Sequence, residues 1–123
     1  SSFEEEYSQI EIEKHECSIS HQKILDKEFL TINDKNFDKV INIVNEILND
    51  SDKFNFIFSP GPRSSSGYNL SFSSYSIKNK NLSILFKEKK PKKNTIVATV
   101  ITYPFCALLI ENIEFYNISV EII

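Results

Sequence analysis

Both glycines of this 123-residue chain lie in one short stretch, Pro60 to Tyr68. The stretch reads Pro-Gly-Pro-Arg-Ser-Ser-Ser-Gly-Tyr and also holds the only arginine, Arg63. Strand-like sequence lies on both sides of it, at Phe54–Phe58 and at Tyr68–Phe72. Because glycine serves positions that need a positive φ or a close backbone approach, we predict a hairpin loop of defined shape between two strands. Loops of this kind often carry binding residues.

Upstream of the loop, the apolar residues follow a helical period. They occur at i, i+3, i+4, i+7, i+10 and i+11, which predicts one amphipathic helix over about residues 36–49. Asn33 or Asp34 is expected to cap its start, and the turn-forming residues 49–52 to end it. The apolar stripe is expected to pack on the protein core.

The rest of the chain has the period of strands. Strands are predicted at Tyr7–Glu16, Lys27–Ile32, Phe54–Phe58, Leu70–Phe72, Leu82–Phe86, Ile96–Thr102, Ala107–Ile113 and Phe115–Ile122. Many short strands with one early helix indicate an α+β fold, a mainly antiparallel sheet resembling a small barrel or sandwich with the helix packed on it. We expect one domain over residues 1–123, with a mobile acidic segment at residues 1–6.

A second turn is predicted inside an apolar stretch, at Tyr103-Pro104-Phe105. Proline cannot donate a hydrogen bond to a strand ladder, so a structural corner is expected there. The flanking aromatic rings favour a cis peptide bond before Pro104 more than in an average X–Pro sequence.

Charge is unevenly distributed along a chain whose net charge is −3. Glutamates dominate residues 1–16 and lysines dominate residues 78–93. The net charge argues against a nucleic-acid partner, and the lysine-rich run Lys87–Lys93 is expected to be the solvated tip of a hairpin. Cys17 and Cys106 either form a disulfide or remain two buried thiols, which their spacing does not decide. The sequence opens without Met or signal peptide, so we expect a processed protein whose targeting segment lies outside this chain.

The glycine-bearing loop does not fit two common catalytic motifs. A P-loop needs Gly-x4-Gly-Lys-Ser/Thr, whereas Gly67 is followed by Tyr68 and Asn69. A nucleophile elbow needs glycine two residues before the serine, and Arg63 holds that place relative to Ser65. The serines are therefore interpreted as turn residues whose hydroxyls bond the backbone. His15, Cys17 and His21 lack the further ligands of a zinc site, and we expect no catalytic residue, metal or cofactor.

Arg63 is the residue of the loop with the most specific chemistry. A guanidinium can grip a carboxylate with two parallel hydrogen bonds, as lysine cannot. That carboxylate could belong to a partner protein or to this chain, in which case Arg63 would fix the loop. The candidate binding loop consists of Gly61, Pro62, Arg63, Ser64, Ser65, Ser66, Gly67 and Tyr68.

Taken together, these motifs resemble the PrcB family, whose members are named as subunits of a protease complex. The resemblance covers about residues 54–113: the loop Gly61–Leu70, the Pro-containing segment Lys87–Lys93, and Thr102-Tyr103-Pro104-Phe105 leading to Ile110. The family pattern is Gly-x-basic-x-Ser/Thr-Gly-Gly-Tyr, and Ser66 stands where that pattern has its first paired glycine. At a positive φ, serine would be strained there.

The resemblance implies an extracytoplasmic bacterial protein, in many cases a lipoprotein, that associates with proteases instead of catalysing a reaction. We therefore expect a non-catalytic protein-binding domain in the periplasm or at the cell surface. Its partner would be a protein such as a protease, with membrane contact only through a lipid anchor absent from this chain. The alternatives are a protease inhibitor that inserts a loop and a small-ligand-binding β domain.

Overall fold

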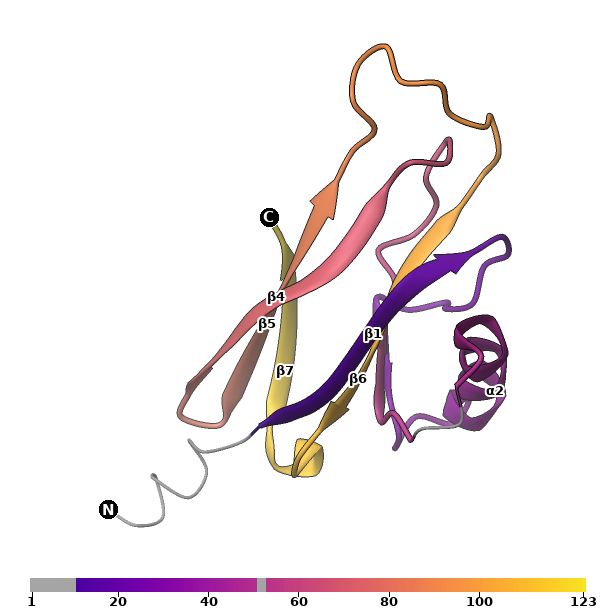
Figure 1. Ribbon diagram of the computed structural model, residues 1–123. Helices are drawn as coiled ribbons and strands as arrows, with labels where there is room; N and C mark the ends of the chain where they lie inside the picture. The colour runs from indigo at the N-terminus through magenta and orange to yellow at the C-terminus, as the bar shows by residue number, and fades with distance from the viewer. Residues whose placement is uncertain (1–10, 51–52) are drawn as a thin grey trace.

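The computed structural model describes residues 11–50 and 53–123, which form seven strands, one α-helix and one short 3-10 helix (Figure 1). The predicted mobile segment at residues 1–6, the first part of the predicted strand Tyr7–Glu16 and the residues Ser51 and Asp52 lie outside the described residues. The elements are β1 (Ile12–Ser20), β2 (Phe29–Thr31), α2 (Phe37–Leu48), β3 (Phe56–Phe58), β4 (Asn69–Lys78), β5 (Asn81–Lys89), β6 (Tyr103–Ile110), η1 (Ile113–Phe115) and β7 (Asn117–Ile122).

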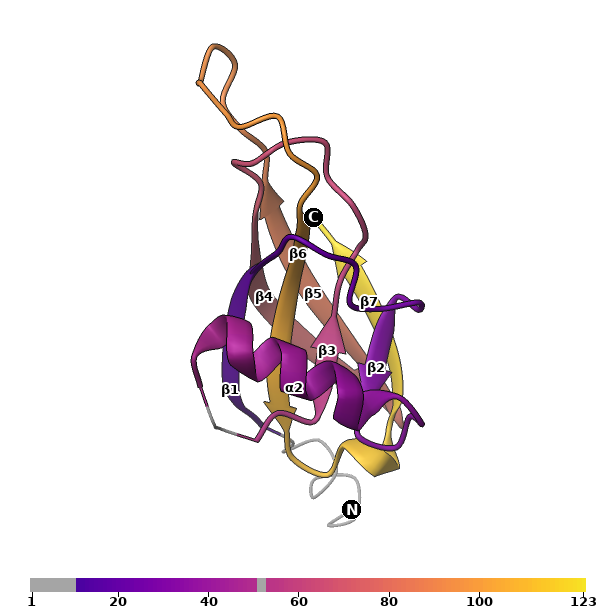
Figure 2. The same ribbon diagram turned by 90° about the vertical axis from the view of Figure 1, so that its right-hand side faces the viewer.

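The strands form two sheets. One has the order β1-β6-β3-β2 and is antiparallel throughout, and the other has the order β4-β5-β7. Within the second sheet β4 pairs antiparallel with β5, whereas β7 pairs parallel with β5. The helix α2 lies on one side of the four-stranded sheet and the three-stranded sheet lies on the other (Figures 1 and 2). The predicted α+β, sandwich-like fold is confirmed.

The helix forms where its apolar period predicted it. Phe37, Val40 and Val44 are buried against the four-stranded sheet, in a cluster that includes Ile57 and Phe105. Its C-terminal cap is Asn49, in the left-handed conformation at φ 52°.

The predicted N-terminal cap was wrong. Asn36 occupies that position without a side-chain cap bond, and Asp34 instead accepts a hydrogen bond of 2.7 Å from the Thr31 N–H in the preceding turn. The carboxylate of Asp34 is therefore used to fix the β2–α2 connection. This bond holds the pKa of Asp34 below its ordinary value, with help from Lys27.

The central strand β6 is buried on both of its faces. Phe105 and Ala107 face the helix, while Cys106, Leu108 and Ile110 face the three-stranded sheet. All five side chains are almost completely excluded from solvent. A strand covered on both sides needs a continuous apolar sequence, which β6 has.

Pro104 lies inside a strand, so the corner predicted at Tyr103-Pro104-Phe105 was wrong. It lies in β6 opposite Ile19, and the chain contains no cis peptide bond among the described residues. Two residues further, the Cα atoms of Cys17 and Cys106 are 4.0 Å apart, the close spacing of a non-hydrogen-bonded pair. Because paired positions alternate along a strand, Pro104 is also at a non-hydrogen-bonded position relative to β1. Its missing N–H therefore removes no hydrogen bond between β6 and β1. Its carbonyl accepts a bond of 2.9 Å from the Ser59 hydroxyl.

Other strand predictions were wrong at particular places. Residues 95–100 have no secondary structure, although Ile96–Thr102 was predicted as a central strand. The strand expected at Ala107–Ile113 starts at Tyr103 and ends at Ile110, and η1 occupies the start of the one expected at Phe115–Ile122.

The two loops predicted as hairpins, Pro60–Tyr68 and Lys87–Lys93, do not join neighbouring strands of one sheet. Each of them connects the two sheets. The loop after β3 leads from the four-stranded to the three-stranded sheet, and the connection after β5 leads back to β6. Both connections lie at the same end of the molecule, where the second one projects furthest (Figure 1).

Cys17 and Cys106 form a disulfide between β1 and β6, which settles the alternative left open by the sequence. The bond closes a loop of 89 residues. A cross-link of this length removes much conformational freedom from the unfolded chain.

We predict that the double substitution Cys17→Ala and Cys106→Ala lowers the free energy of unfolding by about 2–5 kcal/mol, because it releases this constraint. Urea unfolding of the oxidised protein and of the double variant measures the difference. A dithiothreitol-treated wild-type sample should match the variant closely. Equal midpoints for oxidised and reduced protein would contradict a stabilising role.

Candidate functional site: two joined loops

The two glycines have the backbone conformation that their scarcity predicted. Gly61 has φ +116° and Gly67 has φ +95°, both in the region that disfavours other residues. A Cβ atom on Gly67 would also lie 3.0 Å from Cγ of Pro91 and 3.1 Å from Cγ1 of Val97. A Cβ on Gly61 would meet no atom within 4 Å. Gly67 is thus the point where the loop packs against the second connection.

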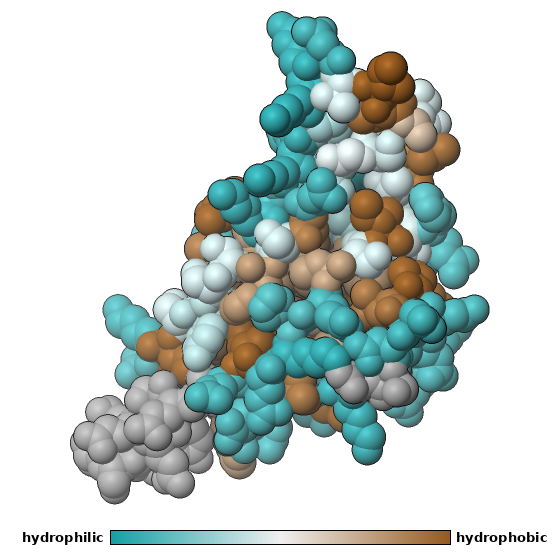
Figure 3. Space-filling model, viewed as in Figure 1, coloured by the Kyte–Doolittle hydropathy of each residue, from teal (hydrophilic) through white to brown (hydrophobic). Residues whose placement is uncertain are grey.

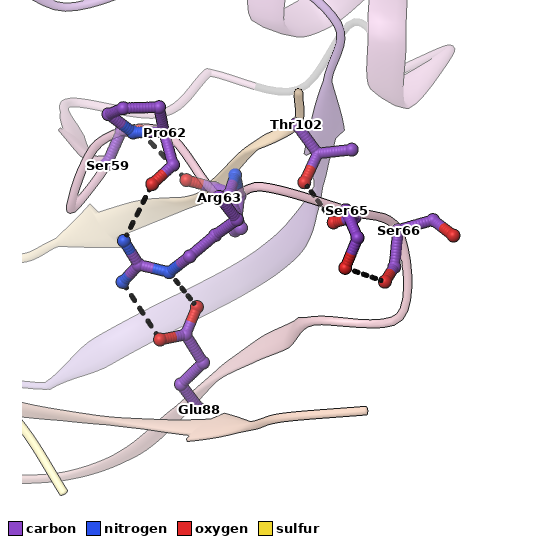
Figure 4. A network of polar contacts seen from close by, with 8 residues as sticks. Ser59, Pro62, Arg63, Ser65, Ser66, Glu88 and Thr102 are labelled. Atoms are coloured by element: carbon purple, nitrogen blue, oxygen red, sulfur yellow. Dashed lines mark hydrogen bonds and ion pairs between the residues drawn. The ribbon is translucent and has the colours of Figure 1, made fainter. Parts of the chain in front are cut away.

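Arg63 grips a carboxylate of its own domain. Its Nε and one terminal nitrogen each donate a hydrogen bond of 2.9 Å to the two oxygens of Glu88 on β5 (Figure 4). A third donor reaches the Pro62 carbonyl at 3.1 Å. The pair is largely shielded from solvent, and the bonds to Glu88 raise the pKa of Arg63. The sequence allowed Arg63 to bind either a partner's carboxylate or one of this chain. In the structure it binds Glu88 of this chain and so fixes the loop.

The loop is also joined along its backbone to the second connection. The Arg63 N–H donates to the Thr102 carbonyl at 2.7 Å, and the Thr102 N–H donates back at 3.0 Å. The buried Thr102 hydroxyl donates to the Ser65 carbonyl at 3.0 Å (Figure 4). The N–H of Ser66 donates to the Ala98 carbonyl at 3.0 Å. The segment 63–66 therefore runs antiparallel beside 98–102.

Ser66 fits this arrangement without strain. Positive φ among the described non-glycine residues occurs only at four asparagines, so Ser66 lies outside the left-handed region. Its hydroxyl oxygen accepts a bond of 2.8 Å from the Ala98 N–H, which a glycine at this place could not do. Serine at position 66 thus adds a second hydrogen bond between residues 66 and 98.

The hydroxyls of Ser65 and Ser66 bond the backbone, as predicted for turn residues. The Ser65 hydroxyl donates to the Ser66 carbonyl at 3.1 Å, and the Ser66 hydroxyl accepts a hydrogen bond from the Ala98 N–H. Among the described residues, no group of three or more His, Cys, Asp or Glu side chains is placed to hold a metal ion. Cys17 is in the disulfide and His15 lies against the ring of Phe72, with 5.0 Å between ring centroids.

A groove of about 620 Å³ lies beside the start of the loop. Its apolar lining includes Ile24, Leu25, Phe58 and Tyr103, and its rim carries charges of both signs from residues 23–28. The backbone of Gly61 borders it. The predicted site residues are therefore divided: Gly61, Pro62 and Arg63 face the groove, whereas Ser65, Ser66 and Gly67 contact the second connection.

The exposure of the apolar residues in the second connection was not predicted from the sequence. Ile96 is 98% exposed, Ile101 59% and Val100 44%, although the predicted strand would have buried them. Figure 3 shows apolar atoms beside hydrophilic ones at this end of the molecule. Their sequence gave no sign of exposure, because β-branched runs of this type are usually interior strands.

The sequence model of the PrcB C-terminal family matches residues 56–111. This part of the chain is therefore similar to the PrcB C-terminal family. The match begins at β3 and ends just after β6, so it contains both joined loops and the Arg63–Glu88 pair. No curated protein and no solved structure matches the chain. Among the described residues, no helix is both long and apolar enough to cross a membrane.

We predict that Arg63→Lys and Glu88→Gln each lower the free energy of unfolding by about 1.5–3 kcal/mol, because each breaks a shielded, two-bond charge pair. Chemical denaturation measures the change. Lys27→Met, which removes an exposed pair with Asp34, serves as control and should cost less than about 1 kcal/mol. Additive effects in the double variant Arg63→Lys with Glu88→Gln would contradict a direct coupling between the two side chains.

We predict that Gly67→Ala is more destabilising than Gly61→Ala. Both place a Cβ at positive φ, at a cost of about 1–2 kcal/mol, but only Gly67→Ala also pushes against Pro91 and Val97. Thermal melts of the two variants make the comparison. If the two variants melt together, the contact between the loops does not constrain position 67.

Proposed function

We propose that this PrcB C-terminal domain is a non-catalytic protein-binding domain of an exported bacterial protein, acting as an accessory subunit of a periplasmic or surface protease complex. The family name supports the association with a protease complex. The observation that carries the proposal is the pair of joined loops, which holds exposed apolar side chains on a fixed framework.

This surface suits a protein partner for two physical reasons. Ile96 and Ile101 present apolar area to solvent, and covering such area favours association. The loops are already fixed by Arg63 and Ser66, so binding them requires less ordering than binding free loops.

An extracytoplasmic location is supported by the disulfide between Cys17 and Cys106, because such bonds persist in oxidising compartments. A lipid anchor outside this sequence would supply the membrane attachment. The net charge of −3 supports a protein rather than a nucleic-acid partner.

A non-catalytic role is supported by the state of the candidate nucleophiles. The hydroxyls of Ser65 and Ser66 are engaged with the backbone, and the two cysteines are joined to each other. Nucleophilic catalysis needs such a group activated by an adjacent base.

The test is capture of partners from the envelope of the source bacterium with tagged, oxidised domain, followed by mass spectrometry. We expect a protease to be enriched by the wild type and reduced about fivefold or more with Ile96→Asp, because the charge resists burial. Ile32→Asp, at an isoleucine that is 54% exposed near α2, is the matched control and should retain the protease. Absence of any protease from the wild-type capture would contradict the proposal.

A second measurement separates an accessory subunit from the inhibitor alternative. The captured protease is assayed with and without an excess of domain. An accessory subunit leaves its activity unchanged or raises it, whereas strong inhibition would replace this proposal by the inhibitor hypothesis.

A further inference from the structure

The segment Thr95–Ile101 has the composition of a strand but belongs to neither sheet. Six of its seven residues are β-branched, and it contains no charge, proline or glycine. Such residues favour strands because their side chains pack well on a pleated surface. The structure nevertheless leaves residues 95–100 without secondary structure.

One side of this segment is occupied and the other is open. Ala98 exchanges hydrogen bonds with Ser66, and the Arg63–Thr102 bridge follows immediately after the segment. Among the described residues, no backbone hydrogen bond engages Ile96, Val97, Thr99, Val100 or Ile101. Unpaired backbone groups in a β-prone segment are a template for pairing with another chain.

The segment is held in position even though it is exposed. Val97 packs where Gly67 leaves room, and both backbone groups of Ala98 are tied to Ser66. Ile96, Val100 and Ile101 meanwhile face solvent. A strand-forming segment that is fixed on one side needs little further ordering to accept a strand on the other.

Basic side chains adjoin the segment. Lys89, Lys90, Lys92 and Lys93 are all exposed, and the one acid of this run, Glu88, is already paired with Arg63. The charge available to a partner here is therefore positive, and it complements acidic side chains.

We propose that the segment Thr95–Ile101 binds an extended strand of the partner protein by β-strand addition. The partner strand alternates apolar side chains, which cover Ile96 and Val100, and carries acidic residues at the end next to the lysines. Main-chain hydrogen bonds supply affinity in this mode, and the side chains supply specificity. This inference rests on the proposed protein-binding function and specifies how the partner is held.

Two other occupants fit the surface less well. Insertion into a bilayer would place unpaired backbone groups in hydrocarbon, which is strongly unfavourable. Pairing with the same segment of a second copy would offer these lysines no acidic residue, because Thr95–Ile101 contains no charge.

The test uses fluorescein-labelled peptides with alternating Val and Thr, about nine residues long, which is within the usual range of strand lengths. Two Asp residues are placed at one end or at the other, and Lys replaces Asp in matched controls. Fluorescence anisotropy with the oxidised domain should show saturable binding of one Asp peptide, about tenfold or more tighter than its Lys counterpart. Equal binding of the Asp and Lys peptides would overturn the predicted charge of the partner.

Backbone methylation tests the pairing itself. In an added strand, alternate N–H groups point toward the domain and the others point away. N-methylation of one alternate set should weaken binding about tenfold or more, and methylation of the other set should change it less than about twofold. Equal effects of the two methylated peptides would overturn strand addition.

Protein variants locate the site. Ile96→Asp should weaken peptide binding about tenfold, while Ile32→Asp should leave it unchanged, and circular dichroism establishes that both variants are folded. Concentration-dependent dimerisation through the segment, or binding of the domain to phosphatidylglycerol vesicles that Ile96→Asp abolishes, would overturn the proposal in favour of the other occupants.

The two proposals fail in different ways. If a protease is captured but no Asp peptide binds, strand addition is wrong and the protein-binding function stands. If an Asp peptide binds with the expected methylation pattern but no protease is captured, strand addition stands and the association with a protease is wrong.

Discussion

Burial of β6 on both faces is the constraint on which the rest of the domain depends. Its side chains alternate between Phe105 and Ala107, which face α2, and Leu108 and Ile110, which face the second sheet. Neither layer alone could remove this strand from water, so the helix and the three-stranded sheet are both required. The disulfide from Cys106 to β1 then joins the centre of the sheet to its edge. Because the chain crosses between the two sheets after β3 and again after β5, both connections emerge at one end of the molecule.

These two connections stabilise each other through polar contacts and one close approach. The Arg63–Glu88 pair ties the loop after β3 to β5. Ser66 ties the same loop to Ala98 in the connection after β5. Gly67 permits the approach of Val97. The glycines, Arg63 and Ser66, which stand out in the sequence, thus hold the two loops together, while the exposed apolar side chains Ile96, Val100 and Ile101 belong to the segment Thr95–Ile101. A charged pair and a glycine provide rigidity here, and plain aliphatic residues provide the exposed surface.

Much of the fold could be predicted because its signals are local. The helix Phe37–Leu48 follows from apolar spacing, and the positive φ of Gly61 and Gly67 follows from their scarcity and setting. The site was harder to predict. Ile96–Thr102 and an interior strand have the same composition, and only the absence of a neighbouring strand distinguishes them. The corner predicted at Pro104 was wrong for a related reason. A proline fits in β6 only if its position makes no hydrogen bond to β1, and this depends on the pairing of the two strands.

The sequence by itself determined the helix, most of the strands, the positive φ of both glycines and the resemblance of residues 56–111 to the PrcB C-terminal family, because each depends on residues close together in the chain or on a recognisable motif. Only the tertiary structure decided that Cys17 meets Cys106, that Arg63 holds Glu88, and that Thr95–Ile101 remains outside both sheets. These outcomes depend on which distant segments become neighbours when β6 is buried from both sides. Local preference can make a segment suited to a strand, but a strand forms only where another lies beside it.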